Sequence, residues 1–312
     1  MNFINNLFKF HKSMSIWNTA IVVLMLLLLL VVISKNNQHE IEGFQQEKEL
    51  VIKENDEVFD DFYTNLYESL LNDQIKNNYE ISNIKRLTNM NKDSKVLVTG
   101  SGTGQHVNIL RKTGIDNVIG IDKHKSFIDL SSKKFPENDY RLGNIKESII
   151  MPIESVSHIL CLQMNIYLIK DKKHIFENFY GWLKPGGYLL LHLVDRDNYD
   201  TVLDASNPIS FFSPQKYAKK RITKSYITFD GFEYVADYNA DNNNNKAYFV
   251  EKFTDKKTNH VRKNKHTLYI PKQTDIVKDV MKTGFELKDK LDLIDIEYQY
   301  QYVYVFQKPV NK

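Results

Sequence analysis

The chain has 312 residues, of which 42% are hydrophobic and 26% are charged, so it can bury a core and is not a disordered protein. Its 42 Lys and Arg residues against 39 Asp and Glu residues leave a net charge of +3, which is too small to indicate nucleic-acid binding. A single cysteine, Cys161, excludes an internal disulfide and a zinc site built from several thiolates, and it fits a reducing compartment.

A nearly unbroken apolar run, IWNTAIVVLMLLLLLVVI, occupies residues 16–33. About twenty such residues span a bilayer as a helix, and no small-residue cleavage site of a signal peptide follows the run. We therefore expect an N-terminal tail over residues 1–14 and a retained single-pass membrane anchor, a transmembrane helix, over residues 15–34. The flanking lysines are nearly balanced and leave the orientation open, but the absence of Asn-x-Ser/Thr acceptors favours a cytosolic main domain.

The segment after the apolar run, residues 35–54, is polar and charged with few apolar positions. This composition predicts a short, partly helical stalk. The globular domain is expected to begin near Asn55, because apolar residues recur at helical spacing from Val58 to Leu70. A second helix is expected over residues 79–88.

From residue 95 onward, strand-like and helix-like segments alternate. Strands are predicted at 95–99, 117–122, 139–142, 157–163 and 187–194, with helices at 104–113, 125–134 and 171–183. Such alternation predicts a parallel sheet that is covered by helices on both faces.

Beyond Arg196 strand-like and helix-like segments no longer alternate. Residues 231–270 read as three antiparallel strands with polar turns at the NNNN tract and near DKKTN. A helix is then predicted between Pro271 and Gly284. The chain closes with two strand-like runs, ELKDKLDL and YQYVYVFQKP.

The stretch VLVTGSGTGQHV, residues 96–107, leads a strand through three glycines into a helix. Such a turn lets the backbone approach a ligand closely and offers it unpaired N–H groups. The dinucleotide fingerprint G-x-G-x-x-G does not fit, because Gln105 stands where its third glycine would fall, which disfavours NAD. Asp122 ends the next strand, at the place where doubly wound folds bind ribose hydroxyls with a carboxylate.

Four stretches in this order and spacing, VLVTGSGTG, IGID, SHILCLQMNIYLI and WLKPGGYLLLHL, resemble class I S-adenosylmethionine-dependent methyltransferases. The resemblance covers most of residues 55–312. It implies a Rossmann-like α/β fold with a seven-stranded methyltransferase sheet whose last strand is antiparallel, and YQYVYVFQKP fits that strand. The small antiparallel insert at residues 231–270 is an addition to this fold. S-adenosyl-L-methionine (SAM) is the cofactor that the resemblance implies; no metal is expected, since the sequence shows no His/Asp ligand cluster.

The resemblance also assigns cofactor contacts. The glycine turn would pack against the methionine part, Asp122 would bind both ribose hydroxyls, and residues 143–145 would face adenine. The expected cofactor-binding residues are Thr99, Gly100, Ser101, Gly102, Gly104, Asp122, Lys123, Asn144, Ile145 and Gln163.

Two of these residues depart from the family, which usually has Asp or Glu at the position of Thr99 and Asp at the position of Asn144. An Asn carbonyl can still accept a hydrogen bond from an adenine amino group. Thr99, in contrast, removes a carboxylate that organises the turn. The departure leaves an alternative open, a catalytically inactive relative that serves as a binding or scaffold protein.

Seven residues are candidates for the substrate side of the site: Tyr63, Tyr67, Tyr167, Asp195, Glu251, Arg262 and His266. The two tyrosines at positions 63 and 67 resemble an aromatic helix that closes over the cofactor in many relatives. Strand alternation in the insert places Glu251 diagonal to Arg262 and His266, as a buried ion pair or as a substrate clamp. The insert is expected to cover the acceptor side of the pocket and to suit an acceptor with an apolar body and an acidic group.

No residue is assigned as a catalyst, because methyl transfer mainly requires that donor and acceptor be positioned. The sequence thus predicts a membrane-anchored SAM-dependent methyltransferase that acts on a small molecule, a lipid head group or a membrane-proximal protein. Nucleic acid is not an expected partner.

Overall fold

The computed structural model describes residues 17, 18, 20–27, 46–206, 215 and 218–310. The chain divides into two compact units, residues 1–42 and 43–312. In the first unit the described residues are helical and expose apolar side chains. No helix within the described part of the chain is long and apolar enough to cross a membrane, and the other residues of the expected tail and anchor lie outside that part.

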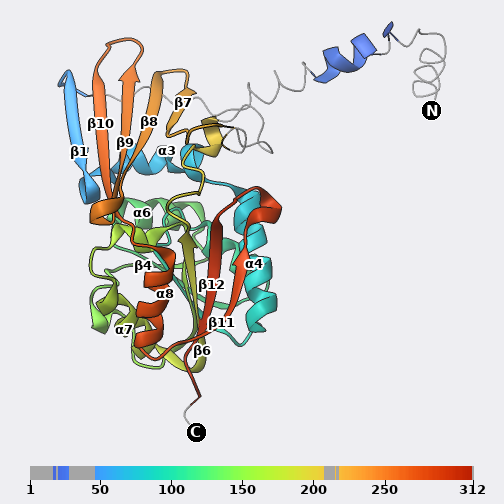
Figure 1. Ribbon diagram of the computed structural model, residues 1–312, viewed down its shortest axis with the longest axis vertical. Helices are drawn as coiled ribbons and strands as arrows, with labels where there is room; N and C mark the ends of the chain where they lie inside the picture. Colours follow the sequence, from blue (N-terminus) through green and yellow to red (C-terminus); the bar gives the residue numbers. More distant parts are fainter. Residues whose placement is uncertain (1–16, 19, 28–45, 207–214, 216–217, 311–312) are drawn as a thin grey trace. The chain divides into compact units, whose positions relative to one another are not determined.

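The second unit contains a seven-stranded sheet in the order β11-β12-β6-β5-β2-β3-β4 (Figure 1). Its strands are β2 (Lys95–Thr99), β3 (Asn117–Asp122), β4 (Asp139–Leu142), β5 (Val156–Cys161), β6 (Leu183–Val194), β11 (Glu286–Asp292) and β12 (Gln301–Gln307). Strands β2 to β6 pair in parallel, whereas β12 runs antiparallel to β6 with Val305 opposite Leu190. The expected antiparallel closing strand is confirmed.

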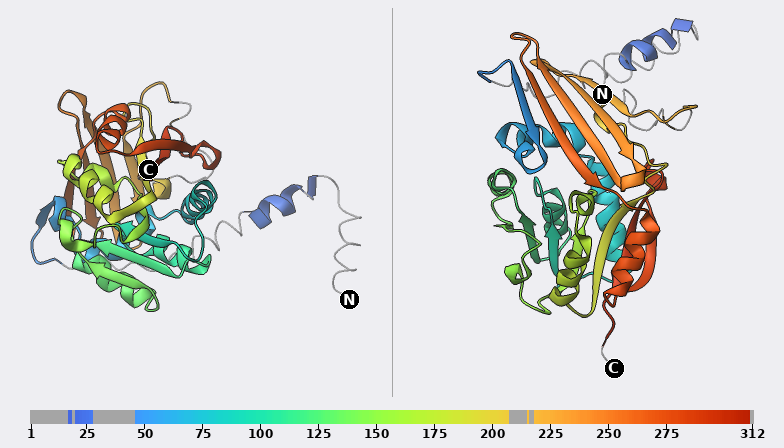
Figure 2. Two further views of the ribbon diagram at one scale, coloured as in Figure 1. Left: turned by 90° about the horizontal axis from the view of Figure 1, so that it is seen from below. Right: turned by 60° about the vertical axis from the view of Figure 1, so that its left-hand side comes forward.

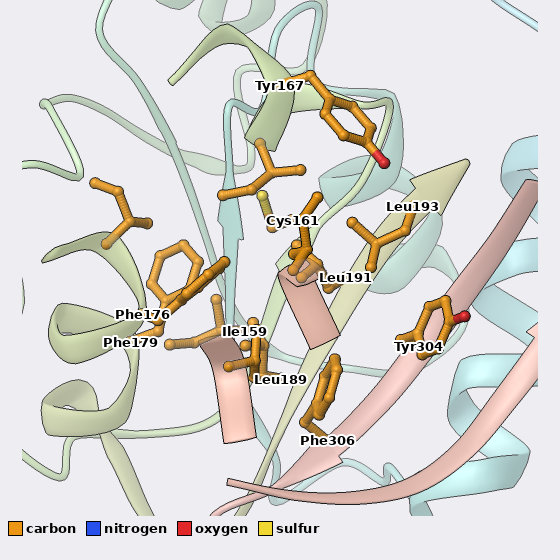
Figure 3. Close-up of a cluster of buried hydrophobic side chains, with 14 of the residues drawn as sticks. Ile159, Cys161, Tyr167, Phe176, Phe179, Leu189, Leu191, Leu193, Tyr304 and Phe306 are labelled. Atoms are coloured by element: carbon orange, nitrogen blue, oxygen red, sulfur yellow. The ribbon is translucent and has the colours of Figure 1, made fainter. Parts of the chain in front are cut away.

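Helices cover this sheet because its strands carry apolar side chains on both faces. They are α4 (Gln74–Thr88), α5 (Gln105–Lys112), α6 (Lys125–Lys134), α7 (Lys172–Trp182) and α8 (Gln273–Lys282). Along β6, Leu189, Leu191 and Leu193 pack with α7 and α8, as the side chains in Figure 3 show in part. Leu190 points to the opposite face and packs in a cluster with residues of α4 and α5.

A second sheet of five strands has the order β1-β10-β9-β8-β7, and Figure 2 shows it from two further sides. Its strands are β1 (Leu50–Glu54), β7 (Lys224–Thr228), β8 (Phe232–Asp241), β9 (Lys246–Asp255) and β10 (Val261–Tyr269). Strands β8, β9 and β10 are antiparallel neighbours, which confirms the three strands expected in residues 231–270. The sheet is larger than expected because β7 and β1 flank them.

Strand β1 corrects the expectation of a partly helical stalk at residues 50–54, and residues 35–45 of that expected stalk lie outside the described part of the chain. It pairs in parallel with β10, with Ile52 opposite Lys263. The five-residue run LVIKE begins with three apolar residues and alternates in burial along its length, and the backbone edge of β10 supplies its hydrogen-bonding partner. The apolar residues of this run show only weak helical periodicity, so pairing with the edge of β10 determines its conformation.

Between β1 and α4 the chain forms a 3-10 turn, η1 (Asn55–Val58), and the expected helix, α3 (Asp61–Leu71). The Asp60 side chain caps α3 by accepting a hydrogen bond of 3.1 Å from the backbone N–H of Tyr63. Phe62 packs edge-on against Phe253 of β9, with 5.3 Å between ring centroids. Helix α3 therefore lies against the five-stranded sheet.

Candidate functional site

A cavity of about 900 Å³ opens at the carboxyl ends of the parallel strands, which is where open α/β sheets bind their ligands. Residues that follow β2, β3, β4 and β5 line it, together with side chains from α3 and the five-stranded sheet. Its lining includes Phe59, Tyr63, Tyr67, Gly100, Gly102, Asp122, Lys123, His124, Asn144, Ile145, Gln163, Met164, Asn165, His192, Phe249, His266 and Leu268.

The glycine turn leaves room for a ligand at Gly102. Gly100 and Gly102 both have positive φ, +60° and +52°, which favours glycine. A Cβ built on Gly100 would lie 2.5 Å from the Nδ2 atom of Asn165, whereas a Cβ on Gly102 would meet no atom within 4 Å. Beside it, the Oγ atom of Ser101 is buried without a hydrogen-bond partner. The space in front of Gly102 thus belongs to the cavity.

Asp122 connects the end of β3 to this turn. One carboxylate oxygen accepts from the backbone N–H of Gly102 at 3.0 Å, and the other accepts from the backbone N–H of His124 at 3.0 Å and contacts its Nδ1 atom at 3.0 Å. An ionised carboxylate has about four acceptor positions, so these three contacts leave about one unused. Burial, Asp122 and Glu251 together raise the pKa of the cavity-lining Tyr67 to about 12, so its phenol keeps its proton.

The loops after β4 and β5 form the next part of the lining. The Asn144 side chain accepts from the backbone N–H of Lys146 at 3.1 Å. Gln163 donates through Nε2 to Asn77 of α4 at 2.9 Å. Gln163 and Met164 both adopt positive φ, +54° and +59°, which is rare for residues with a side chain and is often found at functional sites.

Seven of the ten expected cofactor residues line the cavity, and Thr99, Ser101 and Gly104 do not. The Thr99 hydroxyl is buried and donates to the Leu160 carbonyl oxygen of the neighbouring strand at 3.1 Å. Gly104 instead packs closely against the Tyr140 ring. Asn165 holds the glycine turn, because its Nδ2 atom donates to the Gly100 carbonyl oxygen at 3.0 Å. A side chain that follows a different strand thus contacts the glycine turn.

Three of the seven substrate-side candidates line the cavity: Tyr63, Tyr67 and His266. Glu251 lies just behind them, fully buried, and accepts from Tyr63 Oη at 3.0 Å, Tyr234 Oη at 2.7 Å and His266 Nε2 at 2.8 Å. Glu251 faces Asn264 across the strands, so the diagonal register expected from the sequence is confirmed.

Arg262 differs from its expected position, since it lies outside the lining. It donates to Asp60 at 2.8 Å and to the Val58 carbonyl oxygen at 3.1 Å, and its guanidinium lies 4.8 Å from the Phe62 ring centroid. Alternation showed which face of β10 carries Arg262, but the helix that covers this face decides what it touches. The anionic acceptor inferred from this arginine therefore loses its main support.

Tyr167 and Asp195 also lie outside the lining. The buried Tyr167 hydroxyl accepts from the Val194 backbone N–H at 3.0 Å. The Asp195 carboxylate accepts from the Asp197 backbone N–H at 3.0 Å. Both side chains thus stabilise the loop after β6 instead of facing a ligand.

Several lining residues had no motif that marked them. Phe59 packs on His124 with 4.3 Å between ring centroids, and both line the cavity. Their only signal in the sequence is a position close to a helix start or a strand end. Within the described residues, no group of three or more His, Cys, Asp or Glu is placed to hold a metal ion.

Comparison with known proteins identifies a domain at this site. Residues 97–191 match the family model described as "Methyltransferase domain". Two curated proteins of Schizosaccharomyces pombe are similar to the chain over 109 residues, 35% of its length. An uncharacterized methyltransferase is 29% identical, with 42% of its length covered, and an uncharacterized methyltransferase-like protein is 32% identical, with 41% covered. The match thus spans about two fifths of the length of these curated relatives.

Solved structures share the fold over most of both chains. A SAM-dependent methyltransferase from Clostridium acetobutylicum is 14% identical, with a TM-score of 0.59 over 79% of this chain and 98% of that one. The CcbJ methyltransferase from Streptomyces caelestis is 13% identical, with a TM-score of 0.61 over 79% and 96%. A SAM-bound amino pentose methyltransferase from Micromonospora echinaspora is 13% identical, with a TM-score of 0.57 over 79% and 96%. The fold is that of SAM-dependent methyltransferases.

Proposed function

We propose that this chain, which carries a methyltransferase domain, is a SAM-dependent methyltransferase. The observation that carries the proposal is the open space in front of Gly102, bordered by the Asp122 carboxylate at the end of the adjacent strand. The acceptor is a small molecule, a lipid head group or a protein near a membrane.

The residues at the cavity fit SAM. Gly102 leaves room for close approach, Asp122 retains acceptor capacity for ribose hydroxyls, and Asn144 and Ile145 line the side where adenine is expected. The buried Ser101 hydroxyl lacks a partner at the same turn. When bound, SAM supplies a methyl group on a positively charged sulfonium sulfur.

The chain contributes positioning and exclusion of water. Phe59, Tyr63 and Tyr67 form an aromatic wall over the cavity, and the Glu251 carboxylate behind the wall fixes the Tyr63 ring by a hydrogen bond. Holding two reactants in a reactive geometry lowers a barrier by about 7 to 11 kcal/mol. This is sufficient chemistry for an acceptor that is already nucleophilic, so no dedicated base is needed.

The second candidate is an inactive relative that binds SAM or a partner without transfer. Thr99 favours it, because its hydroxyl is used inside the sheet where the family has a carboxylate. Asn165 favours the enzyme, because it supplies a polar contact to the turn from another strand end. Methyl incorporation from labelled SAM separates the two, since an inactive relative would bind SAM and give no product.

Calorimetric titration of the chain with SAM, with S-adenosylhomocysteine and with NAD tests the proposal. We expect binding of the first two and none of NAD. Asp122→Ala should weaken SAM binding by about one to two orders of magnitude, because hydrogen bonds to a charged group contribute about 1.5 to 3 kcal/mol. The exposed Asp93, changed to Ala, is the matched control and should bind as the wild type does. Unchanged affinity in Asp122→Ala would remove this residue from the site.

We also propose that residues 15–34 anchor the protein in a membrane, with the methyltransferase domain on the cytosolic side. The nearly unbroken apolar character of residues 16–33 and the lack of glycosylation acceptors support the proposal. Alkaline extraction of membranes and protease accessibility in sealed vesicles test it. Release by alkali would contradict the anchor, and a protected domain would contradict the orientation.

A further inference from the structure

His266 and Glu251 form a pair of side chains at the wall of the cavity. His266 lines the cavity from β10, and its Nε2 atom lies 2.8 Å from a carboxylate oxygen of Glu251 on β9. Glu251 is 0% exposed, whereas His266 is 5% exposed. The histidine therefore lies between a buried carboxylate and the space that a ligand would occupy.

The other oxygen of the Glu251 carboxylate accepts hydrogen bonds from two phenols. The hydroxyls of Tyr63 and Tyr234 lie 3.0 and 2.7 Å from it. Burial and the nearby Glu251 carboxylate raise the pKa values of both tyrosines well above the ordinary value of 10. Both phenols therefore keep their hydrogens and act as donors to Glu251.

The partners of Glu251 also determine which nitrogen of His266 carries a hydrogen. Asn264 accepts through Oδ1 from the Nε atom of Arg262 at 3.0 Å, which directs its Nδ2 atom toward Glu251 at 3.4 Å. Two phenols and an amide thus donate to this carboxylate, which is the environment that an ionised carboxylate requires. An ionised carboxylate can only accept, so the Nε2 atom of His266 carries a hydrogen.

The second nitrogen of His266, Nδ1, is open to a ligand. It makes no hydrogen bond to any residue that the structure describes, and unlike the Nε2 atom of His192 it is not fully enclosed by protein. In a neutral ring, a hydrogen on Nε2 leaves an unshared electron pair on Nδ1. A histidine that a carboxylate holds through one nitrogen can take a proton through the other.

Aromatic rings surround His266 at the cavity. The rings of Phe59, Tyr63 and Phe249 line the cavity with it, and their centroids lie 5.5, 5.7 and 5.9 Å from its own. Phe59 also packs against His124, which follows β3, so this wall continues toward the strand end at which the ribose is expected. Aromatic side chains in such a wall pack favourably against the ring of an aromatic ligand.

We propose that His266 is the general base of methyl transfer and that the methyl acceptor is a phenol. The phenol oxygen forms a bond to the methyl carbon while the carbon–sulfur bond breaks and leaves its electron pair on sulfur, and the hydroxyl proton moves to Nδ1. The products are an aryl methyl ether, S-adenosylhomocysteine and an imidazolium ion, which Glu251 stabilises until water takes the proton. The inference rests on the proposed function and specifies an acceptor that becomes strongly nucleophilic only as it loses a proton.

Transfer of labelled methyl groups from SAM to matched phenols and anilines tests the acceptor class. The probes are 4-methoxyphenol and 4-methoxyaniline, and 4-tert-butylphenol and 4-tert-butylaniline, each with the full chain at pH 8. At least one phenol should give its methyl ether faster than the matched aniline gives a methylated amine. The absence of an ether from both phenols would overturn the inference, and so would faster transfer to both anilines.

Replacement of the base tests the role of His266. His266→Gln removes the proton acceptor but keeps an amide N–H that can donate to Glu251. It should lower kcat for the methylated phenol by about 100-fold or more, because general-base catalysis contributes about 10²- to 10⁴-fold. 4-Nitrophenol is largely ionised at pH 8, so any transfer to it should change by less than about threefold. His260→Gln, the same change outside the cavity lining, should behave as the wild type does. Equal losses with the two phenols would overturn the assignment of a base.

Nitrogen NMR of the full chain gives a readout that needs no acceptor. At pH 8 the His266 signals, identified by their absence in His266→Gln, should show a hydrogen on Nε2 and none on Nδ1. Addition of 4-methoxyphenol together with S-adenosylhomocysteine should shift the Nδ1 signal. A hydrogen on Nδ1 in the free protein would overturn the inference. Failure of the wild type to bind S-adenosylhomocysteine in calorimetry would instead overturn the proposed function.

Discussion

Gly102 and Gly114 have the same kind of backbone but different surroundings. Their φ values are +52° and +87°, and a Cβ on either would meet no atom within 4 Å. Gly102 lines the cavity, whereas Gly114 follows α5 and does not. Substitutions at these two glycines therefore separate two effects. One is the loss of stability caused by a left-handed residue with a Cβ, and the other is the loss of affinity caused by filling the ligand space.

Gly102→Ala and Gly114→Ala should each lower the free energy of unfolding by about 1 to 2 kcal/mol, because a left-handed residue with a Cβ is strained. Only Gly102→Ala should also weaken SAM binding, by about tenfold or more, since its methyl group would occupy the ligand space. Chemical denaturation and calorimetry measure the two effects. Equal SAM affinity in both variants would contradict the placement of SAM at this turn.

Two elements of the seven-stranded half, α4 and α5, are joined by buried charges. Glu80 of α4 is fully buried, accepts from His106 of α5 at 3.1 Å and pairs with Lys76 one turn earlier. Removing one member of such a group leaves an uncompensated buried charge. The pairing therefore contributes to stability only while Glu80 is ionised.

The pKa of Glu80 lies at about 2 in the folded chain, below its ordinary value of 4.5. Its contribution, on the order of 3 kcal/mol, is thus fully present above about pH 4.5 and is lost as pH falls toward 2. Glu80→Gln should be less stable than the wild type at pH 7, and the two free energies of unfolding should converge over this acid range. Glu57→Gln, at an exposed site, should stay parallel to the wild type; a constant gap for Glu80→Gln would contradict the assignment.

In the five-stranded half, β10 presents two side chains with different tasks. Arg262 holds the start of α3 through Asp60 and the Val58 carbonyl oxygen. His266 lines the cavity, and its Nε2 atom lies 2.8 Å from a carboxylate oxygen of Glu251. Substitution of Arg262 should therefore affect stability, whereas substitution of His266 should affect the cavity.

Arg262→Ala should lower the free energy of unfolding by about 2 to 3 kcal/mol, because hydrogen bonds to a charged group are lost. His266→Ala should lower kcat/KM for the acceptor while SAM affinity stays within about threefold. Thermal unfolding and steady-state kinetics compare the two once an acceptor is known. A selective loss of turnover in Arg262→Ala at wild-type stability would restore this arginine as a substrate contact.

At the scale of the whole molecule, residues 43–312 form one compact unit that begins before the methyltransferase domain. Strand β1 completes the five-stranded sheet by covering the edge of β10. Because β10 also carries Arg262 and His266, this edge supports both the attachment of α3 and the cavity wall.

A chain that starts at residue 46 should therefore be as stable as the full chain, whereas one that starts at residue 55 should have a Tm lower by several degrees, at about 2 to 4 °C for each kcal/mol lost. The shorter chain exposes the hydrogen-bonding edge of β10, so it should also aggregate more readily. Differential scanning fluorimetry and light scattering compare the three chains. Identical Tm values would show that β1 is not part of the stable unit.

The sequence by itself determined the seven-stranded sheet and the part of the cavity around the glycine turn and Asp122. The bounds expected for β3, β4 and α6 agree with the structure to the residue. Apolar periodicity and a glycine turn are local signals, and residues at the carboxyl ends of adjacent parallel strands must meet at one edge. For that reason the sequence was sufficient to predict that Asp122, Asn144 and Gln163 belong to the site.

Only the tertiary structure decided which residues outside the motifs line the cavity. Asp73, Asp204 and Tyr298 come from three segments that are distant in the chain, and none of them belongs to a motif. Alternation placed Arg262 on the correct face of β10, but its partner Asp60 depends on the packing of α3. Strand β1 likewise exists because β10 offers an edge. Such contacts depend on chain segments that meet only after folding, so no periodicity within either segment records them.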